Sequence, residues 1–184
     1  MLIRNEQPED RAAIHVVVKA AFGRTDEAVL VDRLRGDGSV VISLVAFDDD
    51  AVVGHILLTR MEAPFTALAL APLAVLPDRQ GMGIGSRLVH AALQYAKSAG
   101  WQAVFVLGDP EYYSRFGFNV SMANGFSSPY AGPYLMVLAL TGSLPASAEL
   151  SRTPGRSHRL HSLSVWRRRL GRARPGTGRS SRPT

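Results

Sequence analysis

Three glycines at alternate positions, Gly81, Gly83 and Gly85, are the residues of this chain whose type and spacing most clearly indicate a chemical role. They follow an apolar run at 68–76 and precede a stretch with helical periodicity. The first N–H groups of a helix lack partners within the helix and lie at the positive end of its dipole. Because glycine has no Cβ atom, an anion can reach those N–H groups. The pattern predicts a loop that binds phosphate or pyrophosphate, and a tight turn without a ligand is the alternative.

The spacing of the glycines excludes two common nucleotide-binding motifs. A Walker loop has four residues between its glycines and continues with Lys-Ser or Lys-Thr, whereas three residues separate Gly81 from Gly85. A dinucleotide-binding fingerprint that began at Gly81 would need a third glycine where the chain has Ser86. The pattern that remains is Gln/Arg-x-x-Gly-x-Gly, which begins at Gln80.

The segments around the loop predict a strand, a helix and a second strand. The run 68–76 is apolar, as in a strand buried on both faces, and Pro77 ends it because proline has no N–H to donate. The next segment carries an apolar stripe at helical spacing and ends at Gly100; the stripe comprises Ile84, Leu88, Ala91, Ala92, Tyr95, Ala96 and Ala99. The apolar run 103–107 then predicts a buried parallel strand. Such a unit is a right-handed crossover with the loop at the carboxyl end of its first strand.

The other segments predict the remaining elements of an α/β domain. Expected helices cover 12–22, 26–36 and 111–116, and expected strands cover 2–4, 40–47, 52–59, a segment from Phe118, and 134–140 as the last strand. The strands 40–47 and 52–59 form a hairpin whose turn contains Asp48, Asp49 and Asp50. With no further ligand at useful spacing, this acidic turn is predicted to be solvated rather than a metal site.

The loop motif at 80–85 resembles the pyrophosphate loop of the GNAT superfamily, the acyl-CoA-dependent N-acyltransferases. Members of this superfamily commonly carry Tyr-x-x-x-Gly-Phe after their fifth strand, and Tyr113, Gly117 and Phe118 match that motif. One helix and one strand separate the two motifs, as in the family. The resemblance covers roughly residues 1–141 and implies a central mixed sheet flanked by helices.

Two longer motifs are similar to those of a bacterial branch of largely uncharacterised GNAT proteins. These are Gly-Asp-Pro-x-Tyr-Tyr-x-Arg-Phe-Gly-Phe at 108–118 and Pro-Leu-Ala-Val-x-Pro at 72–77. The resemblance implies an N-acetyltransferase domain at 1–144 that transfers an acetyl group from acetyl-CoA directly to a primary amine of a small molecule or protein. The acceptor itself is not specified by the sequence, and a homodimer is an expectation for the assembly.

The resemblance also implies which backbone groups bind acetyl-CoA. Amides near Ala74 and Val75 are expected to hold the thioester carbonyl and then the oxyanion. The pyrophosphate is expected to bind the backbone of the loop, which comprises Gln80, Gly81, Met82, Gly83, Ile84, Gly85 and Ser86.

Tyr113 lies at the position of the family's general acid. A phenol with a pKa near ~10 stays protonated at neutral pH and can give its proton to the departing thiolate. The alternative is a tyrosine that packs beside Phe116 with its hydroxyl in water. Tyr112 points about 100° away on a helix and is expected to contact the protein core or the cofactor.

The general base is less clearly indicated. Many relatives use a glutamate on the strand before the loop, but the run 68–76 contains no acidic residue. Glu27 is the first candidate, and Glu62 and His55 are others. An acid that only stabilises the first turn of a helix is an equal alternative for Glu27. No base is needed if the amine arrives partly deprotonated.

Composition excludes several other classes of site. The chain has no cysteine, which excludes disulfides, a cysteine nucleophile and thiolate metal ligands. No segment has the length and apolar purity of a membrane span, and the start of the chain lacks the apolar run of a signal peptide. These observations predict one cytoplasmic domain without a metal cofactor.

The formal net charge of +6 is unevenly distributed along the chain. Residues 1–144 contain 11 Lys and Arg against 14 Asp and Glu, which weakly favours a cationic acceptor. Residues 145–184 contain 10 Arg and a single acid, and their composition predicts disorder. Leu160, Leu163, Trp166 and Leu170 could alternatively form a basic amphipathic helix on nucleic acid or an anionic membrane. A non-catalytic acyl-CoA-binding module with such a tail is the second function to consider.

Overall fold

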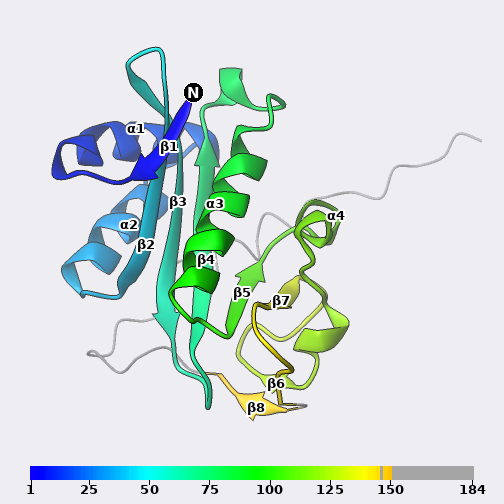
Figure 1. The fold of residues 1–184 in the computed structure, drawn as a ribbon. Coiled ribbons are helices and arrows are strands. Elements are labelled where there is room, and N and C mark those ends of the chain that lie inside the picture. Colours follow the sequence, from blue (N-terminus) through cyan, green and yellow to red (C-terminus); the bar gives the residue numbers. More distant parts are fainter. Residues whose placement is uncertain (146, 151–184) are drawn as a thin grey trace, which may run out of the picture.

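The computed structural model describes residues 1–145 and 147–150, which form a mixed sheet with helices on both faces (Figure 1). The sheet has the strand order β1-β2-β3-β4-β5-β7. Its strands are β1 Leu2–Asn5, β2 Val40–Asp48, β3 Ala51–Met61, β4 Ala67–Val75, β5 Ala103–Leu107 and β7 Leu135–Ala139. Only the pair β4–β5 is parallel within this sheet. The predicted α/β mixed sheet and its crossover are therefore confirmed.

Three longer helices cover the two faces of the sheet. Helices α1 (Arg11–Phe22) and α2 (Asp26–Gly36) pack on one face, and α3 (Ile84–Ser98) packs on the other (Figure 1). The short elements are η1 Pro8–Asp10, η2 Pro77–Arg79, α4 Pro110–Tyr113, η3 Ser114–Phe116 and η4 Ser121–Ala123. Among the helices of the described chain, none combines the length and apolar character needed to cross a bilayer.

The buried stripe of α3 differs from the predicted one. Tyr95 is 46% exposed and Ala99 is also exposed, so both were wrongly placed in the core. The residues that α3 buries are Ile84, Leu88, Val89, Ala92, Leu93 and Ala96. The helix is turned toward Val89 and Leu93 because their branched side chains bury apolar surface, whereas the Tyr95 hydroxyl stays in water.

Strands β4 and β5 part halfway along β4. Their parallel ladder runs from Ala67 opposite Ala103 to Leu70 opposite Val106, and β4 then continues to Val75 beside β3 alone. The register with β3 also shifts here, because Ile56 and Leu58 of β3 lie opposite Leu73 and Leu70 of β4. The extra residue on β4 is a β-bulge, which bends the bulged strand at the place where it leaves β5.

The chain after β5 departs from its predicted elements. The strand expected from Phe118 is reduced to one bridge between Asn119 and Val137, because the Asn119 side chain accepts a hydrogen bond from the Met122 amide and turns the chain into η4. The prediction that 134–140 is the last strand is also wrong. Strands β6 (Phe126–Ser127) and β8 (Ala148–Glu149) form a small parallel sheet.

The segment that follows residue 144 belongs in part to the folded domain. Leu150 is 3% exposed and packs in a core cluster with Phe105 and Phe126. Its amide donates a hydrogen bond to the Ser127 carbonyl at 2.9 Å. The arginine-rich remainder, which includes the possible amphipathic helix at 160–170, lies outside the described residues.

Candidate functional site

The glycine loop presents a row of backbone amides without partners. Gly83 is the N-cap of α3 with φ +79°, Gly81 has the same φ, and no side chain caps the helix. The amides of residues 81–86 donate no hydrogen bond to any described residue, and the first loop amide after them to do so is that of Arg87. Unpartnered amides at a helix N-terminus are the groups that bind phosphate oxygens.

The glycines of the loop serve two different purposes. A Cβ atom at Gly81 or Gly83 would meet nothing within 4 Å, so these residues are needed for their left-handed conformation. A Cβ atom at Gly85 would lie 2.7 Å from the Tyr112 hydroxyl oxygen. Gly85 therefore allows the Tyr112 hydroxyl to lie against the first turn of α3, where it can reach a ligand bound at the loop.

Two side chains fasten the loop to the sheet. The Gln80 side-chain amide donates a hydrogen bond to the Val75 carbonyl at 3.0 Å, which ties the loop to the end of β4. The Arg79 guanidinium lies 3.3 Å from Asp48 and 3.5 Å from Asp49, in the turn between β2 and β3. Asp49 and Asp50 are exposed, as predicted for a solvated turn, and Asp48 and Asp49 also pair with Arg79. In residues 1–145 and 147–150, no group of three His, Asp or Glu side chains has metal-binding geometry.

Of the two amides expected at the thioester, one faces the place where β4 and β5 part. The Leu76 amide donates to the Val53 carbonyl of β3 at 3.0 Å. Because successive amides of a strand point to opposite sides, the Val75 amide is directed away from β3 and the Ala74 amide toward it. The Val75 amide is therefore the one that is open to a ligand between the strands.

Tyr113 is buried beside the end of β5. It is 5% exposed, and a Cβ atom at Gly108 would lie only 2.3 Å from Cε2 of its ring. The ring packs edge-on against Tyr112 and Phe118, with centroid distances of 5.0 and 5.7 Å. Burial raises the pKa of the Tyr113 hydroxyl well above its usual value, so the phenol stays protonated.

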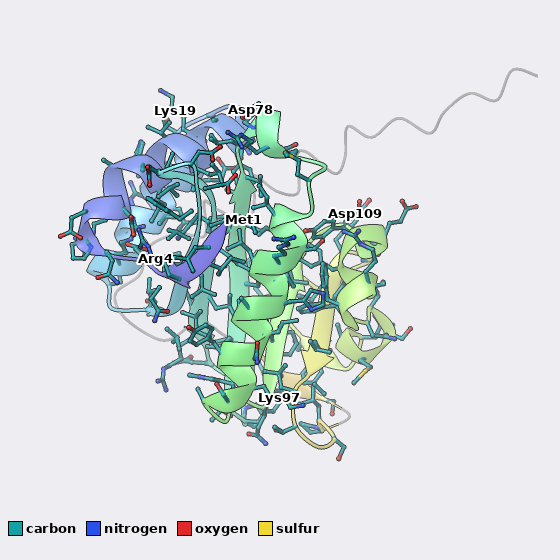
Figure 2. The ribbon with its side chains drawn as sticks, turned by 45° about the horizontal axis from the view of Figure 1, so that its top comes forward. Met1, Arg4, Lys19, Asp78, Lys97 and Asp109 are labelled. Carbon is teal, nitrogen blue, oxygen red and sulfur yellow. The ribbon has the colours of Figure 1, made fainter. Side chains whose placement is uncertain are left out.

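The glycine loop and the two tyrosines of the second motif lie toward the same end of the molecule. Asp78, in η2 just before the loop, and Asp109, the N-cap of α4, lie toward one end of α3, and Lys97 lies at the other end (Figure 2). Tyr112 approaches from α4 toward α3, and Tyr113 approaches the end of β5. The structure therefore brings the loop and both tyrosines of the second motif to the place where β4 and β5 part.

The base candidates are not brought to the same place. Glu27 is 3% exposed in the first turn of α2; its Oε1 accepts from Arg24 at 3.0 Å, and its Oε2 is buried without a described partner. Helix α2 and Tyr113 lie on opposite faces of the sheet, so the two groups could act together only across the gap between β4 and β5. Glu62 follows β3 at the end of the sheet remote from Val75.

His55 belongs to a buried polar cluster with Glu6, Ser43 and Arg35. His55 is fully buried; its Nε2 lies 2.9 Å from the Ser43 hydroxyl and 3.6 Å from Glu6, and Arg35 lies 2.8 Å from Glu6. Burial lowers the pKa of His55, so its imidazole is neutral near pH 7. Burial opposes ionisation of Glu6, but hydrogen bonds from His55, Arg35 and Ser43 outweigh it and lower the pKa of Glu6 to about 2.

This cluster joins elements that are distant in the sequence. It connects the segment after β1 with β2, β3 and α2, and His55 lies opposite Ala74 in the β3–β4 ladder. Sequence analysis did not identify Glu6, because a single acidic residue after a short strand carries no motif.

A pocket of about 270 Å³ lies on the face of the sheet opposite α3. Its floor is formed by side chains at alternate positions, Ala69 and Ala71 of β4 and Phe105 and Leu107 of β5, together with Leu135 of β7. Leu70 and Val106, the last paired residues of β4 and β5, also line it. Its outer wall comprises Met61, Ser128, Pro129, Tyr130, Glu149 and Leu150. The pocket was missed from the sequence because its wall comes from three separated segments without a motif.

Comparison with known proteins gives one family and several close relatives. Residues 6–118 match the model of the acetyltransferase (GNAT) family. The chain is 41% identical over 133 residues to the uncharacterized N-acetyltransferase YjhQ of Escherichia coli K12, which covers 67% of this chain and 73% of that protein. Met61 of the outer wall lies within the family match, and the other residues of that wall follow it.

Two solved structures of relatives contain a coenzyme A species. A GNAT family acetyltransferase from Brucella melitensis, in complex with acetyl-CoA, is 33% identical with a TM-score of 0.72, covering 83% of this chain and 96% of that one. The Escherichia coli N-acetyltransferase YhbS, in complex with CoA, is 31% identical with a TM-score of 0.74, covering 82% and 89% of the two chains.

Proposed function

Because the chain belongs to the acetyltransferase (GNAT) family, we propose that it transfers an acetyl group from acetyl-CoA to a primary amine by direct attack in a ternary complex. The observation that carries this proposal is the row of unpartnered amides at 81–86, set at the end of β4 where β4 and β5 part. The protein is an acyl-CoA-dependent acetyltransferase, and its relatives crystallised with acetyl-CoA and CoA support the same cosubstrate.

The residues of the loop fit a pyrophosphate. The amides of residues 81–86 offer hydrogen-bond donors at the positive end of α3, and the open space at Gly81 and Gly83 leaves room for an anion. The Tyr112 hydroxyl, held against Gly85, is a further donor beside the loop. Acetyl-CoA supplies the activated thioester when it is bound there.

The Val75 amide supports the thioester carbonyl. It points into the opening between β4 and β5 and is the donor available to an oxygen that gains negative charge as the amine attacks. The Ala74 amide points toward β3 and not into the opening. The Ala74 methyl group packs in the core between the sheet and helices α1 and α2.

Tyr113 is the proposed general acid. As the carbon–sulfur bond breaks, its hydroxyl gives a proton to the departing thiolate, and its raised pKa keeps that proton in place beforehand. Glu27 is the proposed base: its buried Oε2 has no partner in the described chain, which leaves it able to accept the proton that the amine nitrogen loses. Tyr113 and Glu27 lie on opposite faces of the sheet. They can therefore act on the same reacting atoms only if these atoms lie in the opening between β4 and β5.

Calorimetric titration with acetyl-CoA tests the proposal on the wild type and on Gly83→Asp. We expect the aspartate to weaken acetyl-CoA binding at least tenfold, because it places a carboxylate beside the amides that receive the pyrophosphate. Gly38→Asp is a matched control, since Gly38 also has a positive φ and open space around its Cα but lies between α2 and β2. Equal acetyl-CoA affinity in wild type and Gly83→Asp, or no binding by wild type, would contradict the proposal.

A further inference from the structure

We propose that the pocket opposite α3 is the acceptor site, and that it takes small primary amines whose body is apolar, such as alkyl or arylalkyl amines. This inference rests on the proposed acetyl transfer and names its acceptor class. It narrows the expectation of a cationic acceptor, based on the acidic balance of residues 1–144, to amines whose body is apolar.

The position of the pocket connects it with the reacting atoms. Leu70 and Val106 line the pocket and are also the last paired residues of β4 and β5. Beyond them the strands separate, so the pocket on one face adjoins the opening that the Val75 amide faces. An amine held in the pocket can present its nitrogen to a thioester in that opening.

The lining of the pocket favours an apolar body. Its floor carries only hydrocarbon side chains, with two alanines of β4 that are incompletely buried although β4 lies in the middle of the sheet. Those alanines, Ala69 and Ala71, leave the floor open, whereas larger residues there would fill it. A hydroxyl or a second ammonium placed against such a floor would lose its hydration without gaining a partner.

The volume of the pocket sets the size of the acceptor. About 270 Å³ is close to the lower end of the roughly 300–1,000 Å³ of pockets that enclose drug-sized ligands. A single ring or a short alkyl chain fits that space, whereas a molecule of several sugar rings does not.

Glu149 gives the pocket its preference for an amine. It is the one carboxylate in the described lining, and the described lining contains no cationic residue. Its charge attracts the ammonium form in which an aliphatic amine exists near neutral pH. That form has no lone pair, so the amine first gives a proton to solvent, and the neutral nitrogen then moves to the opening and attacks the thioester. A neutral guest such as the tail of a longer acyl group gains nothing from this carboxylate.

The origin of the wall explains how relatives can differ in acceptor. The loop, the opening and Tyr113 lie within the family match at 6–118, but Tyr130, Glu149 and Leu150 follow it. Acceptor preference is therefore carried in part by residues that lie outside the segment matched by the family model.

The test compares hexylamine and 2-phenylethylamine with spermidine and an aminoglycoside, by release of CoA thiol from acetyl-CoA. We expect the two apolar amines to have the higher kcat/KM. Ala69→Leu, which narrows the floor, should raise their KM at least tenfold without changing acetyl-CoA affinity. Glu149→Gln should raise the same KM about threefold to tenfold at low salt and less at high salt. Ala20→Leu and Glu9→Gln, at exposed positions of α1 and η1, are the matched controls.

Binding is measured beside turnover, so that folding and catalysis do not obscure the result. Thermal unfolding checks that each variant is folded, and ligand-observed NMR measures hexylamine binding to the CoA-loaded wild type and variants. Preference for spermidine or the aminoglycoside, or no hexylamine binding to the CoA-loaded wild type, overturns the acceptor class while leaving acetyl-CoA binding intact. A change in Ala69→Leu confined to hexanoyl-CoA against acetyl-CoA would assign the pocket to the acyl chain and also overturn the inference. Failure of acetyl-CoA to bind at all would instead refute the proposed function.

Discussion

The glycine loop and the acceptor pocket adjoin the same opening, but they are built in different ways. The loop uses backbone amides of one continuous segment, 81–86, whose conformation depends on Gly81 and Gly83. The pocket uses residues from β3, β4, β5 and β7, from 128–130 and from 149–150. A site made of local backbone is specified by a few residues close together, whereas a site made of distant side chains depends on the whole fold.

Removal of the Tyr113 hydroxyl is expected to have the largest effect. Tyr113 belongs to neither the glycine loop nor the pocket. If the backbone donors alone sufficed for the chemistry, loss of its hydroxyl would change the rate little. We expect Tyr113→Phe to lower kcat by about 10²-fold or more, as for a lost general acid, with unchanged acetyl-CoA affinity. Steady-state thiol release and calorimetry measure the two quantities. Tyr95→Phe, at an exposed position of α3, is the control, and an unchanged kcat in Tyr113→Phe would remove the acid role.

The substitution Gly85→Ala, which adds a methyl group, tests the glycine loop. A Cβ atom there would lie 2.7 Å from the Tyr112 hydroxyl, so Gly85→Ala must displace that hydroxyl from the loop. We expect acetyl-CoA affinity to fall about tenfold by calorimetry. The same substitution in a Tyr112→Phe background should cost much less, because the clashing atom is gone. Equal losses in both backgrounds would mean that Gly85 is needed for something other than this contact.

The contrast between the two halves also explains what the sequence could and could not predict. The loop, the crossover and the hairpin at Asp48–Asp50 depend on glycine, proline and turn residues that act locally, and the structure confirms them. The strand expected at Phe118 failed because the Asn119 side chain redirects the chain, which alternation of apolar residues does not reveal.

The pocket and the buried cluster could not be predicted for a related reason. Glu149 reaches the pocket only because β8 pairs with β6, and Glu6 meets His55 only because β1, β2 and β3 are neighbours in the sheet. Such contacts join residues far apart in the chain, and one sequence carries no local signal for them. The sequence predicted Tyr113 as the general acid from a family motif and Glu27 as a candidate base in the first turn of a helix. In the structure the sheet separates these two residues.

Acid unfolding tests whether the buried cluster supports the sheet beneath the opening. The lowered pKa of Glu6, about 2, means that its ionised form is favoured in the folded state. Its stabilisation is therefore complete above its unfolded pKa near 4.5 and is lost as the pH falls from there toward 2. We expect Glu6→Gln to lower the melting temperature by several degrees at pH 7 and to reduce the fall in wild-type stability between pH 5 and pH 3. Glu9→Gln, an exposed neighbour, should leave both quantities unchanged.

The smallest predicted effect concerns the Gln80 side chain, which ties the loop to β4. Gln80 donates a hydrogen bond to the Val75 carbonyl, and a net contribution of about 0.5–1.5 kcal/mol for such a bond corresponds to roughly twofold to tenfold in affinity. We expect Gln80→Ala to weaken acetyl-CoA binding by about threefold with kcat unchanged, and Gln94→Ala, exposed on α3, to have no effect. A loss as large as that of Gly83→Asp would mean that side chains, and not backbone amides alone, hold the pyrophosphate. The loop and the pocket would then both depend on side chains. They would differ only in whether the residues that form them are close together or far apart in the sequence.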